Sequence, residues 1–119
     1  MATEFSISES TREAGASTVR VLSLMGQLDA HTFPKLQAAL EAIDDDEPRV
    51  VLEFSKLEYI SSAGLGVLSK MTKEFREREG DIRLAALPDK IKNIMDLLGF
   101  SQVIQVHKTV DDAVATYTT

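Results

Sequence analysis

The chain has 119 residues, with 13 lysines and arginines against 19 aspartates and glutamates, and it contains no cysteine or tryptophan. This length fits one domain with a single core, and the lack of cysteine excludes disulfides, thiolate metal sites and cysteine nucleophiles. The formal net charge of −6 argues against nucleic acid as a partner, and no apolar run approaches the roughly 20 residues that span a bilayer. Residues 1–5 lack the pattern of a secretion signal, so we expect a cytoplasmic domain without membrane contact.

The amino-terminal part of the chain predicts a hairpin of two strands. Residues 4–9 and 18–25 carry their apolar side chains in the pattern of β-strands. Gly15 lies between them in a segment of small and polar residues, which is typical of a short connection. Because no helical segment separates the two strands, we expect them to pair antiparallel. Gly26 ends the second strand.

A helix and a central strand are predicted next. From Thr32 the apolar residues recur at helical spacing, and Pro34 falls in the first turn, where its missing N–H removes no hydrogen bond. The acidic segment 44–48 ends this helix. We interpret that segment as a solvated turn rather than a calcium site, because the spaced ligands and turn glycine of an EF-hand loop are absent. Residues 50–54 form a nearly continuous apolar run, as expected of a strand buried on both faces.

The remaining chain alternates between helices and strands. Its predicted segments are a helix over 65–79, a strand over 82–87, a helix over 88–98 that Gly99 terminates, a strand over 103–106 and a helix over 109–117 that Thr109 caps. Leu97 and Phe100 fall partly off the apolar stripe of the helix that precedes Gly99. We expect them to complete the core around that turn, the alternative being an exposed apolar patch.

These segments predict an α/β fold. Alternating strands and helices form a largely parallel sheet joined by right-handed crossovers. We expect a single domain with a mixed, mostly parallel sheet of about five strands and about four helices, which lie largely on one face if each strand is added beside the previous one.

The least ordinary stretch covers residues 58–68, where the buried central strand leads into a helix. This is a position at which α/β sheets commonly hold functional groups. Ser61 and Ser62 lie at the start of that helix, where free N–H groups and the positive end of the helix dipole favour an acceptor oxygen or an anion. Two interpretations stay open: either one serine serves only to cap the helix, or the two serines form a site with a chemical function.

Three kinds of chemistry are excluded at these serines. A nucleophile elbow needs G-x-S-x-G, whereas Ser62 has Ile60 and Gly64 at those offsets. A phosphate-binding loop would need a lysine that follows its glycines, and a response-regulator receiver would need an aspartate in place of the E-F-S at 53–55. His107 has no partner at metal-ligand spacing. No base, metal cluster or cofactor loop accompanies the serines, so we expect a protein that is not an enzyme and that uses no metal or cofactor.

The segment I-S-S-A-G-L-G-V-L at 60–68 resembles the phosphorylation-site segment of bacterial anti-sigma factor antagonists, the STAS domain family, whose usual pattern is D-S-[ST]-G-L-G-V-[IL]. The resemblance extends along the chain. G-Q-L-D at 26–29 matches the family's G-E-L-D turn, residues 50–57 match its central strand and the loop that follows, and residues 97–104 match its late helix-to-strand turn. It implies one STAS domain over residues 1–119.

This resemblance implies a phosphorylation-controlled binding module. The unphosphorylated antagonist would sequester an anti-sigma factor, itself a serine-protein kinase, and would release it when Ser62 is phosphorylated; a PP2C-type phosphatase would reverse the modification. Ser61 is the second choice of acceptor. Ser61 stands where the family has aspartate, and Ala63 where it has serine or threonine. The alternative is a non-switching STAS scaffold or adaptor in a stress-sensing or transport complex.

The partner surface is expected at the end of the sheet where the parallel strands finish. Asp29 and His31 follow the second strand at that end, the same end as Ser62. The residues expected to contact the anti-sigma factor are Asp29, His31, Ser61, Ser62, Ala63, Gly64 and Leu65. For Asp29 the alternative is a role as a turn or capping residue, and for His31 simple exposure to solvent. We expect a monomer or weak dimer.

Overall fold

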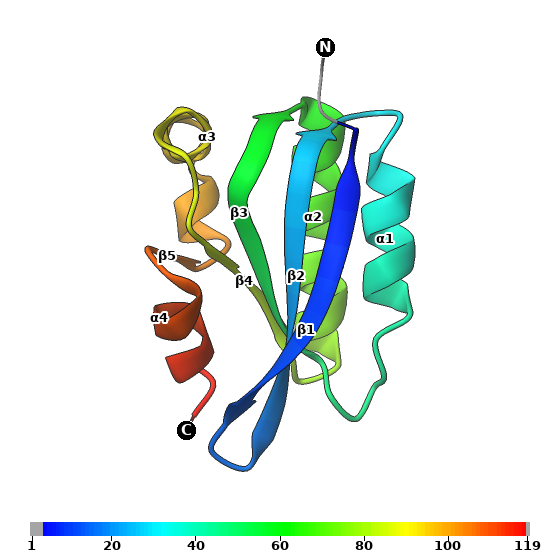
Figure 1. Ribbon diagram of the computed structural model, residues 1–119, viewed down its shortest axis with the longest axis vertical. Helices are drawn as coiled ribbons and strands as arrows, with labels where there is room; N and C mark the ends of the chain where they lie inside the picture. Colours follow the sequence, from blue (N-terminus) through cyan, green and yellow to red (C-terminus); the bar gives the residue numbers. More distant parts are fainter. Residues whose placement is uncertain (1–3, 119) are drawn as a thin grey trace.

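The computed structural model describes residues 4–118 and contains, in chain order, the predicted succession of strands and helices (Figure 1). The elements are β1 (Ser6–Ala14), β2 (Ser17–Leu28), α1 (Phe33–Glu41), β3 (Arg49–Ile60), α2 (Ser62–Glu77), β4 (Asp81–Ala85), α3 (Asp89–Leu97), the 3-10 turn η1 (Phe100–Gln102), β5 (Val106–His107) and α4 (Val110–Ala115). None of these helices is long and apolar enough to cross a membrane.

The strands form one sheet in the order β1-β2-β3-β4-β5. β1 pairs antiparallel with β2 around a turn in which Gly15 adopts a positive φ of 62°, a conformation that favours glycine. The other neighbours pair parallel. The predicted fold class, the hairpin and the mixed sheet are therefore confirmed.

Helices cover the two faces of this sheet unequally. α1 and α2 lie side by side behind the sheet in Figure 1, and together with α3 they enclose the larger core. α4 covers the other face over a second cluster that includes Val51, Val114 and Tyr117. The three helices that connect parallel strands lie on one face because right-handed crossovers require it, whereas α4 follows the last strand and is free of that constraint.

The structure departs from the predicted segments in several places. β1 runs to Ala14, and β2 continues through Gly26 to Leu28, so the prediction that Gly26 ends the second strand is wrong. β3 continues to Ile60, because two register shifts against β2 insert extra residues and carry the strand past the polar Ser55 and Lys56. β5 is confined to two residues, since the chain before it forms η1. Phe100 packs against the larger core as expected, but Leu97 is 86% exposed, so the prediction that it completes the core is wrong.

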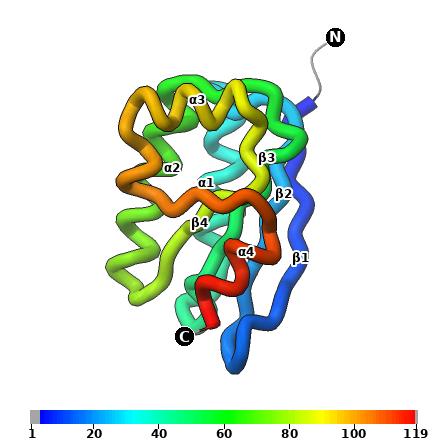
Figure 2. Tube along the Cα trace, turned by 90° about the vertical axis from the view of Figure 1, so that its left-hand side faces the viewer, coloured from blue at the N-terminus to red at the C-terminus, as the bar shows by residue number. Residues whose placement is uncertain are grey.

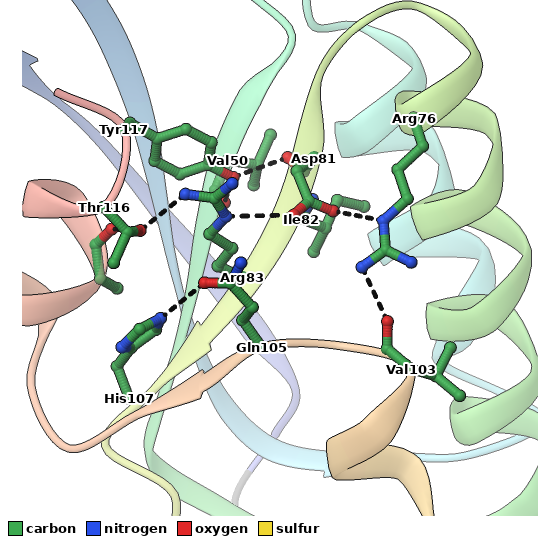
Figure 3. Close-up of polar contacts among 11 residues, drawn as sticks. Val50, Arg76, Asp81, Ile82, Arg83, Val103, Gln105, His107, Thr116 and Tyr117 are labelled. Atoms are coloured by element: carbon green, nitrogen blue, oxygen red, sulfur yellow. Dashed lines mark hydrogen bonds and ion pairs between the residues drawn. The ribbon is translucent and has the colours of Figure 1, made fainter. Parts of the chain in front are cut away.

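A polar network ties α4 to the sheet at the end opposite α3 (Figure 3). The buried carboxylate of Asp81 accepts hydrogen bonds from Arg76 Nε at 2.9 Å and from Arg83 Nε at 3.0 Å. The guanidinium of Arg83 lies 4.0 Å from the ring centroid of Tyr117, whose hydroxyl is 2.9 Å from the carbonyl oxygens of both Val50 and Asp81. These contacts satisfy polar groups that burial would otherwise leave unpaired.

Tyr117 gives the fold a specific sensitivity to alkaline pH. Burial raises the pKa of the Tyr117 phenol well above its ordinary value, so above about pH 10 the unfolded chain loses this proton while the folded chain keeps it. We expect the free energy of unfolding of the native protein to fall as the pH rises beyond that point. Tyr117→Phe should lower the free energy of unfolding by about 1 kcal/mol at neutral pH. In this variant the free energy of unfolding should not show the part of the alkaline decrease that comes from the phenol. Urea unfolding of the native protein and the variant at pH 8 and pH 11 measures both effects. If the free energy of unfolding decreases equally in the two proteins between these pH values, Tyr117 is not the source of the alkaline sensitivity.

Candidate functional site

The junction of β3 and α2 places two adjacent serines at the end of the sheet. β3 ends at Ile60, and the amide of Ser61 donates a hydrogen bond of 2.9 Å to the carbonyl of Leu28, the last residue of β2. Ser62 then begins α2 and is exposed. The start of the helix is thus fixed to the end of the neighbouring strand, while the first helical residue faces solvent.

The two serines have different roles. Ser61 is the N-cap of α2, with an extended backbone, and its half-buried side chain accepts a hydrogen bond from the amide of Gly64 at 3.3 Å. The carbonyl of Ser61 also accepts the first hydrogen bond of the helix, from Leu65. The hydroxyl of Ser62 makes no hydrogen bond to another residue within 4–118. Capping is therefore carried out by Ser61 and leaves Ser62 available.

Gly64 allows α2 to approach the sheet closely. A Cβ atom at this position would lie 2.8 Å from the carbonyl oxygen of Leu28 and 2.9 Å from its Cγ, and real contacts of Cβ atoms are essentially never this short. Gly66, the second glycine of the motif, is exposed and would place a Cβ in open space. The first glycine is needed for packing, whereas the monomer does not need the second.

The loop after β2 is closed by reciprocal hydrogen bonds between Asp29 and Thr32, just before α1 begins. Asp29 Oδ1 accepts hydrogen bonds from the amides of His31 at 2.9 Å and Thr32 at 3.1 Å. The Thr32 hydroxyl accepts a bond from the amide of Asp29 and donates one to the carbonyl of Gln27. The bond from the His31 amide is the main reason why the pKa of Asp29 is lowered. Asp29 therefore has the turn role that the sequence left open, and Thr32, which the sequence did not single out as a site residue, closes the same turn.

The predicted contact residues divide into exposed and buried ones. His31 and Ser62 are exposed, and Asp29, Ser61 and Ala63 are half-buried. Gly64 and Leu65 are buried, and Leu65 belongs to the larger core. Within residues 4–118 no group of acidic or histidine side chains is arranged to hold a metal ion. What the structure presents at this end is a free hydroxyl beside a rigid loop.

Comparison with known proteins shows which family the sequence matches. The sequence model of the STAS domain family matches residues 12–113. BtrV of Bordetella bronchiseptica, named as a candidate anti-sigma factor antagonist, is 32% identical over 100 residues, which cover 83% of this chain and 86% of BtrV. The anti-sigma-B factor antagonist of Listeria monocytogenes is 32% identical over 82 residues, 68% of this chain and 72% of that protein.

Solved structures give the same result for the fold. The crystal structure of an anti-sigma factor antagonist from Mycobacterium paratuberculosis superimposes with a TM-score of 0.76 at 26% sequence identity, and the superposition covers 93% of each chain. The sequence match runs from the end of β1 into α4 and includes the β3–α2 junction and α3, and the structural match covers 93% of the chain. This chain therefore belongs to the STAS domain family.

Proposed function

We propose that this protein is an anti-sigma factor antagonist, and that phosphorylation of Ser62 releases the anti-sigma factor that it binds. The observation that carries the proposal is the exposed Ser62 hydroxyl, which takes no part in holding the monomer together because Ser61 caps the helix. Relatives named as anti-sigma factor antagonists support the same function. The protein acts by binding rather than by catalysis.

A phosphate on Ser62 affects the monomer and the complex differently. It adds about −1.5 to −2 charges at pH 7 and three acceptor oxygens. At the first residue of α2 the unpaired amides and the helix dipole accommodate this charge, so the fold survives. In a complex the same group lies in the interface, where it must lose water or meet like charge. Phosphorylation therefore weakens docking without unfolding the antagonist.

Ser62 is a better acceptor than Ser61 for a geometric reason. A kinase must surround the acceptor hydroxyl, and Ser62 is exposed whereas Ser61 is half-buried. Modification of Ser61 would also disturb the hydrogen bond that its hydroxyl accepts from the Gly64 amide, a bond of the capping type worth about 1 kcal/mol. The kinase is the anti-sigma factor itself, and a PP2C-type phosphatase restores the free hydroxyl. The exposed part of the 29–32 loop, which includes His31, contacts the partner beside Ser62.

The acceptor can be identified by incubating the protein with the serine-kinase anti-sigma factor of the source organism and ATP. We expect mass spectrometry to find one phosphate on the native protein and on Ser61→Ala, and none on Ser62→Ala. A PP2C-type phosphatase should then remove the group. A native protein that stays unmodified, or a Ser62→Ala variant modified to the same extent as the native protein, would overturn the assignment of Ser62.

A further inference from the structure

The carboxyl-terminal part of α3 exposes apolar side chains that the monomer does not use. Leu97 is 86% exposed and Leu98 is 58% exposed, and Val103 lies exposed in the turn that follows. Burial of a leucine side chain stabilises a protein by about 1.5–3 kcal/mol, and Leu97 contributes almost none of this to the folded monomer. An apolar group of this kind next to charged residues indicates an interaction site.

These leucines share one face of α3 with a lysine. Because the helix repeats every 3.6 residues, Lys90, Ile94 and Leu97 lie in a row, and Leu98 lies beside them. Ile91 and Met95 border this row on its inner side and are buried in the larger core. The acidic residues of α3, Asp89 and Asp96, fall on a different side of the helix, and Asp96 is paired with Lys92 at 2.8 Å. The exposed apolar row is therefore free of negative charge from its own helix.

A groove continues this row toward β3. It has a volume of about 620 Å³ and lies between the bulged end of β3 and the start of α3. Its lining includes the apolar Met25, Leu57 and Ile91, the lysines Lys56 and Lys90, and one acidic residue, Glu58. Neither Lys56 nor Lys90 forms an ion pair with another of the residues 4–118. We call Lys56, Lys90, Ile94, Leu97 and Leu98 the α3 surface: two unpaired lysines at one end and exposed leucines at the other.

The α3 surface lies at the functional end of the molecule. Figure 2 shows α3 crossing the end at which β3 passes into α2, so the helix runs beside the chain that leads to Ser62. Lys56 and Lys90 outnumber the one acidic residue of the groove, Glu58, so the groove is locally positive on a chain whose net charge of −6 repels acidic partners from most of its surface. An acidic segment with one apolar side matches this place in both charge and polarity.

We propose that the α3 surface binds an acidic, amphipathic segment of the anti-sigma factor, whose carboxylates meet Lys56 and Lys90 while its apolar side chains cover Leu97 and Leu98. This inference rests on the proposed function and deepens it. It also explains the direction of the switch: a phosphate on Ser62 adds negative charge at the end of the molecule where an acidic segment docks, and like charges repel.

The test is calorimetric binding of the purified anti-sigma factor to the native protein and to paired variants. K56E/K90E should weaken binding at least tenfold, and the affinity of the native protein should fall with added salt, because exposed ion pairs are screened. L97A/L98A should also weaken binding about tenfold or more while its thermal unfolding stays close to native, since both side chains are largely exposed. K70E/K73E is the matched control. It changes the net charge by the same amount on the exposed side of α2, and it should bind as the native protein does.

The outcomes separate this inference from the proposed function. If the native protein binds and Ser62→Asp does not, but K56E/K90E and L97A/L98A bind like the native protein, the α3 surface is not the docking site and the proposed function stands. A loss of affinity in K70E/K73E equal to that in K56E/K90E would mean that only the overall charge matters, which also overturns the inference. If the native protein binds no anti-sigma factor, both the inference and the proposed function fail.

Discussion

Replacing Ser62 by aspartate is expected to weaken binding to the anti-sigma factor about a hundredfold, a loss of about 2.8 kcal/mol, while the thermal unfolding of the monomer stays almost unchanged. Both halves of this result follow from the position of the residue. Ser62 begins α2 and is exposed, so a carboxylate there faces the positive end of the helix dipole in the monomer. In the complex the same carboxylate lies where the partner docks. Calorimetry and circular-dichroism melting measure the two effects separately.

Two control variants make this result specific. Ser62→Ala removes the hydroxyl without adding charge and should bind as the native protein does, because the monomer does not use that hydroxyl. Ser69→Asp places the same charge at an exposed position two turns further along α2 and should also bind normally. If Ser62→Asp unfolds at a clearly lower temperature than the native protein, the serine is mainly structural. If it binds with native affinity, charge at this position does not control docking.

The sheet and its helices could be predicted because their signals are local. The continuous apolar run at Val50 and Val51 shows that both faces of β3 are covered, and in the structure these two side chains belong to opposite cores. What the sequence could not predict depends on long-range geometry. The polar residues 55–56 concealed the continuation of β3, because only the register against β2 shows that the chain remains extended through its bulges. The Asp81 network likewise joins residues from α2, from β4 and from the segment after α4.

The motif predicts where the candidate site lies, but it does not predict the separate roles of the two serines within it. Two adjacent serines at the start of a helix are equivalent as sequence, and either can cap. The distinction depends on which side chain turns toward the amide of Gly64, and the structure assigns that contact to Ser61. Leu97 illustrates the same limit. Its apolar character indicated a core position, whereas Leu97 lies in line with Lys90 on α3 and away from the buried Ile91 and Met95, so its side chain remains outside.

Gly64→Ala and Gly66→Ala should change the stability of the protein in opposite directions. Both variants place alanine in α2, where alanine stabilises the helix by up to about 1 kcal/mol more than glycine does. This gain is common to the two variants. Only Gly64 lies against the sheet, with a Cβ that would be 2.8 Å from the carbonyl oxygen of Leu28 and 3.0 Å from Ile60 Cγ1. We expect Gly66→Ala to raise the free energy of unfolding slightly and Gly64→Ala to lower it by about 1–3 kcal/mol, the usual cost of overpacking.

The physical reason is that the backbone of β2 cannot move aside as a flexible side chain could. The start of α2 is held against Leu28 by the Ser61 amide, and Gly64 donates to the Ser61 hydroxyl, so an added methyl group pushes on the cap and on the strand together. Urea unfolding of the two variants and the native protein measures the difference. Equal stability of the two variants would show that α2 can shift without cost, and that the position of Ser62 is not fixed by this contact. A destabilised Gly64→Ala that also binds the anti-sigma factor weakly, at a temperature where it is still folded, would instead show that docking depends on where the helix begins.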